Sequence, residues 1–231
     1  MNAPLVLGGA TIAAGLAAHG AFYRNSFLFG PALGRLPTNG RDVALTFDDG
    51  PNPDATPPIL DALARAGVPA TFFVLGRHAE RWPALVRRVH DEGHAIGNHG
   101  YYHRKLHFKG PRYVRDDVTR GADAIAQACG ARPALFRAPH GFRSPWVNAI
   151  ARSLGERVIG WSLGVWDSDR PGVDEIVHRT LAGTRPGSIV LLHDGDGYAA
   201  AGDRRQTADA VPRIVAQLTA RGYRFVPVPA A

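Results

Sequence analysis

Two adjacent carboxylates, Asp48 and Asp49, directly follow a short apolar run that is expected to form a strand. Asp is depleted within strands and neighbouring carboxylates repel each other, so a strand end beside a cation or an arginine tolerates the pair best. The alternative is a plain turn, because Gly50, Pro51 and Asn52 follow at once. Metal ligands at the ends of other strands would favour the cation site.

Two histidines four residues apart, His99 and His103, are the candidate partners. On a helical turn this spacing places both imidazoles on one side, where they can share a cation. Alone they are better explained as solvated surface histidines. With Asp49 as a third ligand they form a site with open positions for water and substrate, as in a catalytic rather than a structural metal site. Asp48 then remains free to act as a general base.

Three more polar residues follow other apolar runs. His193 is either a buried structural histidine or a general acid that Asp167 holds and charges. Arg137 would be costly to leave unpaired, so we expect it to orient Asp48 by a charge-assisted hydrogen bond, with a surface arginine as the alternative.

Three apolar side chains are candidates to line a cleft for a sugar ring or an acyl methyl, with core packing as their alternative: Trp161, Trp166 and Leu191.

Short apolar runs alternate with amphipathic windows from Arg41 onward. The expected strands span residues 43–47, 70–75, 95–96, 134–136, 158–161, 188–192 and 223–226. The expected helices span residues 57–66, 79–92, 112–128, 145–154, 174–181 and 207–221. This alternation predicts an α/β fold, a distorted (β/α) barrel of about seven parallel strands with outer helices. The candidate residues follow the strands at their carboxyl ends, where parallel barrels place their active sites.

Composition limits the function classes. The chain has 231 residues, of which 45% are hydrophobic and 20% charged, as expected for one globular domain. The net charge is +7, but the arginines are scattered rather than clustered, so we expect no nucleic-acid partner and leave attraction to anionic lipid or glycan groups open. The single Cys129 excludes an internal disulfide and a cysteine-based zinc site. No Gly-rich phosphate loop follows the first strand, which argues against a nucleotide cofactor.

The N-terminal region, residues 1–40, differs in composition from the expected catalytic domain, residues 41–231. Residues 3–23 carry no formally charged side chain and are just long enough to span a bilayer. A signal peptide, a membrane anchor and an arm packed on the domain are the alternatives. We favour an anchor, because residues 1–10 lack the basic start of a signal peptide. Residues 25–40 have the composition of a linker. A membrane-associated or cell-envelope location is expected, on a side of the membrane that the sequence leaves open.

From about Arg41 to Val226 the chain resembles the polysaccharide deacetylase family, carbohydrate esterase family 4. Residues 46–51 match the family's first motif in full, and residues 191–193 match its fifth. Residues 99–103 match the second motif at both histidines, with Gly100 where Ser or Thr is usual. Residues 137–141 resemble the third, with His140 in place of an aromatic residue. The fourth keeps only its second Asp, Asp167, and has Trp166 one place earlier than the usual Trp.

The resemblance implies a role for each matching residue. It implies Asp49, His99 and His103 as metal ligands, Asp48 as catalytic base and His193 as catalytic acid. It also implies an oxyanion site at a backbone N–H near His140 and Gly141. The implied cofactor is a divalent metal, zinc before cobalt, nickel or manganese.

The expected reaction is the hydrolysis of an N-acetyl or other N-acyl group from an amino sugar in a polysaccharide or other glycan. The first alternative is a deacetylase or deformylase of a lipid-linked amino sugar, which the apolar N-terminus and His140 favour. The second alternative is a catalytically silent glycan-binding module. It is disfavoured because the chain retains the candidate catalytic and metal-binding residues Asp48, Asp49, His99, His103 and His193. Hydrolysis of O-acetyl esters uses the same residues and stays open.

Overall fold

The computed structural model describes residues 3–199 and 201–230; residues 1 and 2 of the expected N-terminal region and residues 200 and 231 of the expected domain lie outside the described residues. The α-helices within these described residues are α1 (Ala3–Phe22), α2 (Thr56–Ala66), α3 (Gly76–Arg81), α4 (Pro83–Asp91), α5 (Pro111–Cys129), α6 (Val147–Ser153), α7 (Val173–Gly183) and α8 (Arg205–Ala220). The strands are β1 (Asp42–Asp48), β2 (Thr71–Val74), β3 (Ala95–Asn98), β4 (Leu135–Phe136), β5 (Arg157–Val158), β6 (Leu163–Gly164), β7 (Ser188–His193) and β8 (Arg224–Phe225).

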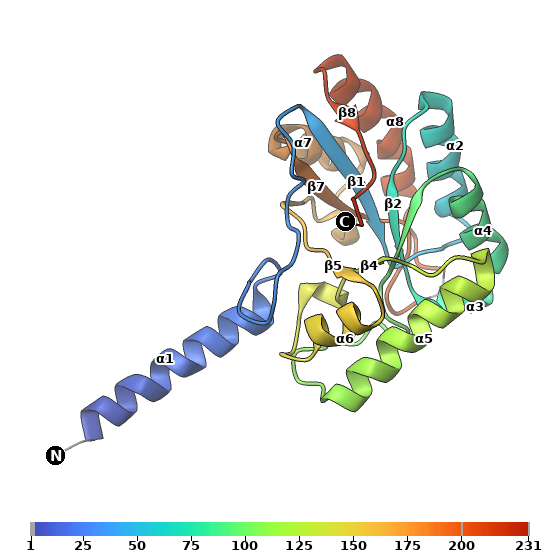
Figure 1. Cartoon of the computed structure of the whole chain (residues 1–231). Helices are drawn as coiled ribbons and strands as arrows, with labels where there is room; N and C mark the ends of the chain where they lie inside the picture. Colours follow the sequence, from blue (N-terminus) through green and yellow to red (C-terminus); the bar gives the residue numbers. More distant parts are fainter. Residues whose placement is uncertain (1–2, 200, 231) are drawn as a thin grey trace.

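The strands form one parallel sheet that curls into a barrel-like shape. Its order is β5-β4-β3-β2-β1-β7-β6, with β8 paired to β1. Helices α2 to α8 surround the curled sheet, whereas α1 projects away from it (Figure 1). The predicted α/β fold, a distorted (β/α) barrel with outer helices, is confirmed. Because every pairing is parallel, the carboxyl ends of the strands meet on one side.

The central strand β1 is buried along its whole length, as a strand covered on both faces must be. Phe47 on β1 stacks on Phe72 of β2, with ring centroids 5.0 Å apart. Apolar faces of the amphipathic outer helices cover this core, among them Val211 and Ile214 of α8. The packed strands therefore hold the carboxyl end of β1 rigidly.

Two predicted element boundaries are wrong. The helix expected over residues 79–92 is split into α3 and α4 at Trp82, because Pro83 cannot continue a helix but is well suited to begin one. The strand expected over 158–161 ends at Val158, and the short strand β6 follows it after a turn that was not predicted. Only two residues of β6 pair with β7, too few to leave a periodic pattern.

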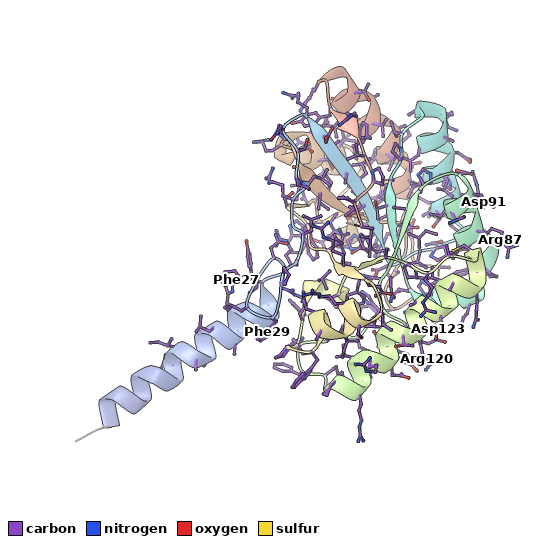
Figure 2. All side chains as sticks on the ribbon, viewed as in Figure 1. Phe27, Phe29, Arg87, Asp91, Arg120 and Asp123 are labelled. Carbon is purple, nitrogen blue, oxygen red and sulfur yellow. The ribbon has the colours of Figure 1, made fainter. Side chains whose placement is uncertain are left out.

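Residues after α1 pack closely on the barrel. Leu33 bridges to Ile159 beside β5, and Arg35 bridges to Ser188 at the start of β7, so this segment spans the gap between those strands. Phe27 and Phe29 lie at the junction of α1 with the domain (Figure 2), where Gly20 lies against the ring of Phe29. Within the described residues, no helix, α1 included, is long and apolar enough to cross a membrane.

A buried arginine, Arg143, fastens this N-terminal segment to the domain. Its guanidinium donates to the backbone carbonyls of Ser26 and Gly30 and to Oδ1 of Asn148, and its backbone N–H donates to the carbonyl of Ala21. Only 1% of Arg143 is exposed. A charged group is tolerated there because carbonyl oxygens surround it.

We expect Arg143→Ala to lower the free energy of unfolding by about 2–3 kcal/mol, because hydrogen bonds of a charged donor are lost and buried carbonyls lose their partner. Urea unfolding measures this change. Arg152→Ala, at an exposed position of α6, is the matched control and should change stability by less than about 0.5 kcal/mol. Equal stability of the two variants would contradict the fastening role of Arg143.

Candidate active site

The carboxyl end of β1 brings two acids to the mouth of the barrel. Asp48 is the last residue of β1 and pairs in register with His193, the last residue of β7. Asp49 follows with φ 72°, a left-handed conformation that L-residues other than Gly adopt rarely and Asp more readily than most. This turn directs the two carboxylates differently and brings Asp49 to the histidines that follow β3.

Asp49, His99 and His103 form a buried cluster. Their candidate ligand atoms all lie within 4.8 Å of one another. Oδ1 of Asp49 is 3.3 Å from Nε2 of His99 and 3.1 Å from Nε2 of His103, yet it makes no well-aligned hydrogen bond. A buried carboxylate oxygen without a proper donor, faced by two imidazole nitrogens, fits a shared divalent cation.

The expected helical turn between His99 and His103 is wrong. Both histidines lie in the loop that follows β3, and His103 has φ 56°. The side chain of Asp117 on α5 holds this loop by accepting the backbone N–H of Tyr102 at 2.9 Å. A fixed loop therefore brings the imidazoles together, with ring centroids 5.4 Å apart.

Surrounding groups orient two of the three cluster residues, His99 and Asp49. Nδ1 of His99 is 2.8 Å from the carbonyl of Arg137, which directs Nε2 towards Asp49. Nδ1 of His78 is 2.8 Å from the carbonyl of Asp49 itself. Burial opposes ionisation of Asp49, but His103 and His99 outweigh it and hold the carboxyl pKa well below its usual range. A deprotonated carboxylate is what a cation requires.

Asp48 is held by a buried arginine, as predicted. NH1 of Arg137 donates to Oδ1 of Asp48 at 2.7 Å and to Oγ1 of Thr46 at 2.7 Å, and NH2 donates to the carbonyl of Gly160 at 2.9 Å. Burial lowers the pKa of Arg137, and Asp48 opposes this shift. The arginine lies behind Asp48 and is wholly buried, so its place suits positioning of the carboxylate rather than contact with a substrate.

His193 and Asp167 form a second pair at the same edge. Nδ1 of His193 is 2.9 Å from Oδ1 of Asp167, whose Oδ2 accepts the backbone N–H of His193 and the hydroxyl of Thr207, both at 2.8 Å. Burial disfavours the imidazolium, but Asp167 outweighs it and raises the pKa of His193 to about 9. The same pairing lowers the pKa of Asp167 against its burial. His193 is therefore charged near neutral pH.

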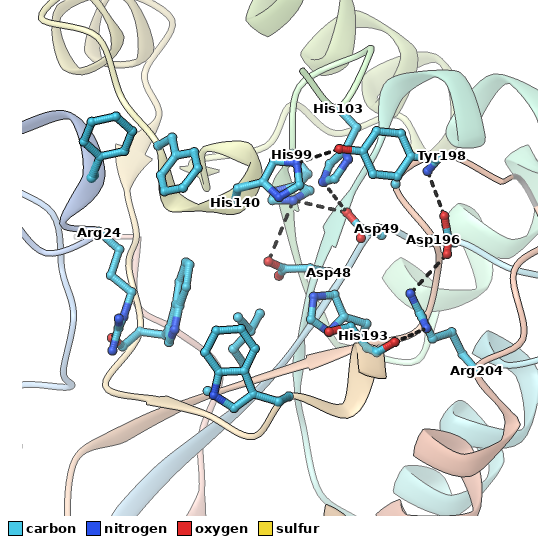
Figure 3. Close-up of a pocket in the computed structure, with 18 residues that line it drawn as sticks. Arg24, Asp48, Asp49, His99, His103, His140, His193, Asp196, Tyr198 and Arg204 are labelled. Carbon is cyan, nitrogen blue, oxygen red and sulfur yellow. Dashed lines mark hydrogen bonds and ion pairs between the residues drawn. The ribbon is translucent and has the colours of Figure 1, made fainter. Parts of the chain in front are cut away.

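These groups open into one cleft of about 440 Å³, within the range typical of small-molecule sites (Figure 3). The cleft is lined by five predicted core members of the site, Asp48, Asp49, His99, His103 and His193, and by four predicted substrate contacts, His140, Trp161, Trp166 and Leu191. Gly141 has φ 72°, and a Cβ there would contact the Trp161 indole at 2.7 Å. Gly141 is not among the cleft-lining residues, but its lack of a side chain lets the Trp161 indole pack close to the backbone.

His140, the substitution in the third motif, lies at the mouth of the cleft. Its Nε2 is 3.1 Å from the hydroxyl of Tyr198, and its ring centroid is 4.6 Å from that of His103. Burial and the charges of His103 and His99 lower the pKa of His140 to about 4. A neutral ring therefore occupies the position of the usual aromatic side chain.

Several residues of the site were not predicted. Phe22, Arg24, Asp196, Tyr198 and Arg204 line the cleft and come from outside the motifs. Asp196 lies three residues after His193, which ends β7 and the fifth motif, so its place after a strand end was an available signal. The buried partners His78 and Thr207 each reach the site through one hydrogen bond, from α3 and α8, and no local pattern marks such contacts.

The sequence matches a family model described as polysaccharide deacetylase over residues 35–159. A chitooligosaccharide deacetylase of Bradyrhizobium sp. (strain ANU 289) is 43% identical over 196 residues, which cover 82% of this chain and 90% of that protein.

Two solved structures resemble the fold. A peptidoglycan N-acetylglucosamine deacetylase in complex with 4-naphthalen-1-yl-N-oxidanyl-benzamide superposes with a TM-score of 0.81 and 34% identity, over 86% of this chain and 91% of that chain. A pseudoenzyme of carbohydrate esterase family 4 from Bacillus anthracis superposes with a TM-score of 0.77 and 26% identity, over 84% of this chain and 66% of that chain. The resemblance inferred from the five motifs is thereby confirmed, and the chain belongs to the polysaccharide deacetylase family, carbohydrate esterase family 4.

Proposed function

We propose that this hydrolase of carbon–nitrogen bonds removes the N-acetyl group from an amino sugar in a chitooligosaccharide- or peptidoglycan-type polymer, in a metal-dependent reaction at the cell envelope. The observation that carries the proposal is the meeting of Asp48, a carboxylate–histidine cluster and the His193–Asp167 pair in one cleft. The activities of the related deacetylases support the substrate class.

Asp49, His99 and His103 would hold the ion, and two imidazoles with one carboxylate suit zinc. When bound, a divalent ion lowers the pKa of water and polarises a carbonyl group. Oxygen-only ligand sets, which suit magnesium or calcium, differ from this one. Cobalt, nickel and manganese remain alternatives for the same three ligands.

Asp48 takes a proton from the attacking water as the water oxygen bonds to the amide carbon. Arg137 holds the Asp48 carboxylate by a hydrogen bond and aims it into the cleft. The N–H groups of Gly141 and Phe142 already donate to the carbonyls of Ala138 and Pro139, so we assign the N–H of His140 to the developing oxyanion.

His193 then donates its proton to the departing nitrogen as the carbon–nitrogen bond breaks, which releases acetate and an amino sugar. Asp167 has no contact with the reacting atoms in this scheme. It positions His193 and keeps it protonated until the amine leaves.

Asp167→Asn should move the alkaline limb of the pH profile of kcat/KM to lower pH by about 1 unit or more, because a neutral amide no longer stabilises the imidazolium. His193 donates only while protonated, so activity is lost as pH rises through its pKa, which Asp167 raises to about 9. Profiles between about pH 5 and 10 measure the shift. The exposed neighbour Asp169, changed to Asn, is the control. An unmoved alkaline limb in Asp167→Asn would refute the charging role.

A deacylation screen of the metal-loaded protein tests the proposed reaction and substrate class together. Acetate should be released from chitooligosaccharides or peptidoglycan fragments. Release of formate or acetate from polyprenyl-linked amino sugars alone would establish the lipid-linked alternative, and release from O-acetyl esters alone would establish an esterase. Metal binding without any hydrolysis would support a silent module, as the fold of the Bacillus anthracis pseudoenzyme resembles this one.

A further inference from the structure

Part of the cleft wall comes from upstream of the matched family region, which spans residues 35–159. Phe22, the last residue of α1, and Arg24 both line the cleft. Arg24 lies on one side of the carboxylate–histidine centre, and Asp196 and Arg204 lie on the other (Figure 3). The cleft therefore extends to both sides of the reacting groups, as a site for an oligomeric substrate would.

The N-terminal segment also fixes the tryptophan in this wall. Nε of Arg24 and Nδ2 of Asn25 both donate to the backbone carbonyl of Trp161 at 3.0 Å. The Arg24 guanidinium lies over the indole of Trp161, 5.0 Å from the ring centroid. Asn25 can approach this closely because Gly160 has no side chain. Arg143 holds the same segment on the domain, because its guanidinium donates to the backbone carbonyls of Ser26 and Gly30.

An aromatic rim completes the wall. The ring of Phe22 meets that of Phe142 edge to face, with centroids 5.3 Å apart, and lies 5.0 Å from the ring of His107. Phe22 remains 49% exposed, although Phe is usually buried. An exposed aromatic group that lines a cleft marks a binding surface.

We propose that Phe22, Phe142 and Trp161 form an additional sugar subsite, which binds a neighbouring sugar of the chain while its target sugar is deacetylated. This inference rests on the proposed function. Aromatic rings pack against the apolar faces of sugar rings, and Arg24 beside them supplies donors for hydroxyl groups. A hydrocarbon chain is disfavoured as occupant, because it would take water away from the charged Arg24 guanidinium and offer it no acceptor beyond the Trp161 carbonyl.

Binding of an N-acetylglucosamine hexamer tests the subsite without turnover. Metal-loaded Asp48→Asn protein is combined with either Phe22→Ala or Phe27→Ala and titrated by calorimetry. Phe27 is the matched control, because it is a 77% exposed Phe on the same segment outside the set of cleft-lining residues. Phe22→Ala should weaken hexamer binding about fivefold, and Phe27→Ala should leave it unchanged. Phe142→Ala removes the ring that contacts Phe22 and should weaken hexamer binding in the same way.

Turnover with Asp48 intact gives a second readout. Phe22→Ala should raise KM for the hexamer about fivefold and KM for single N-acetylglucosamine by less, whereas Phe27→Ala should leave both KM values as in the wild type. Equal hexamer binding by the Phe22→Ala and Phe27→Ala proteins, or no binding by either, would overturn the subsite. A loss confined to polyprenyl-linked sugars would also overturn it, in favour of a hydrocarbon site. A wild-type protein that binds the hexamer without hydrolysing it would refute the proposed function alone.

Discussion

Asp48→Asn should lower kcat by about 10² to 10⁴-fold while the protein keeps its metal. Asn has nearly the same shape as Asp but cannot accept a proton from water. The three proposed ligands are left intact, because Asp48 lies outside the cluster of Asp49, His99 and His103. Arg137 would still donate to the amide oxygen, so the fold around position 48 should persist.

Acetate release and metal content, measured on the same preparation, separate the two roles. Asp54→Asn is the matched control, because Asp54 is an exposed carboxylate on the loop that follows β1. That variant should keep full activity. Substantial turnover by Asp48→Asn would overturn the role of Asp48 as base, and loss of its metal would place Asp48 among the ligands instead.

His103→Ala should lose the metal and nearly all activity. The loss of affinity should exceed the roughly 10- to 100-fold that follows removal of a ligand's hydrogen-bond partner, because here a ligand itself is removed. Nε2 of His103 lies 3.1 Å from Oδ1 of Asp49, so its removal opens one side of the cluster. Competition with a chromophoric chelator measures the metal affinity.

His178→Ala provides the control, because His178 is exposed on α7. It should bind metal as the wild type does. A His103→Ala protein with wild-type metal affinity would show that the cluster does not hold the ion.

The sequence was most informative where one strand carries the chemistry. Asp48 and Asp49 follow a run that is apolar because the strand is buried on both faces. The sequence therefore showed both where the strand lies and where its apolar run gives way to carboxylates. The parallel register of β1 and β7 then places Asp48 beside His193, because the two residues end adjacent strands at the same edge of the sheet. The pairing of Arg137 with Asp48 followed from the cost of an unpaired buried charge.

Prediction failed where tertiary contacts override local pattern. The spacing of His99 and His103 predicts a helical turn, yet a loop held by Asp117 brings the imidazoles together instead. Residues 25–40 have a linker's composition, yet their carbonyls are bonded by Arg143, more than a hundred residues away. Gly-rich composition permits close approach as well as flexibility, and only the fold distinguishes the two.

Departures from the family's motifs concentrate around the substrate-binding part of the cleft. His140 replaces an aromatic residue but remains neutral, because burial and neighbouring histidines lower its pKa to about 4. Trp166 is displaced by one position and is 67% exposed at the cleft. Asp48 and the His193–Asp167 pair, which we assign to proton transfer, match the family pattern. The differences therefore bear on which sugar is bound rather than on how its amide is hydrolysed.

Metal-dependent acetate release from an N-acetylglucosamine oligomer tests the central claim most directly. The purified protein is stripped with a chelator, assayed, reloaded with zinc and assayed again on the same oligomer. The proposed ligand set and base predict that hydrolysis disappears with the metal and returns with it. Hydrolysis at an unchanged rate by the stripped protein, or no hydrolysis after verified zinc binding, would contradict the proposed function.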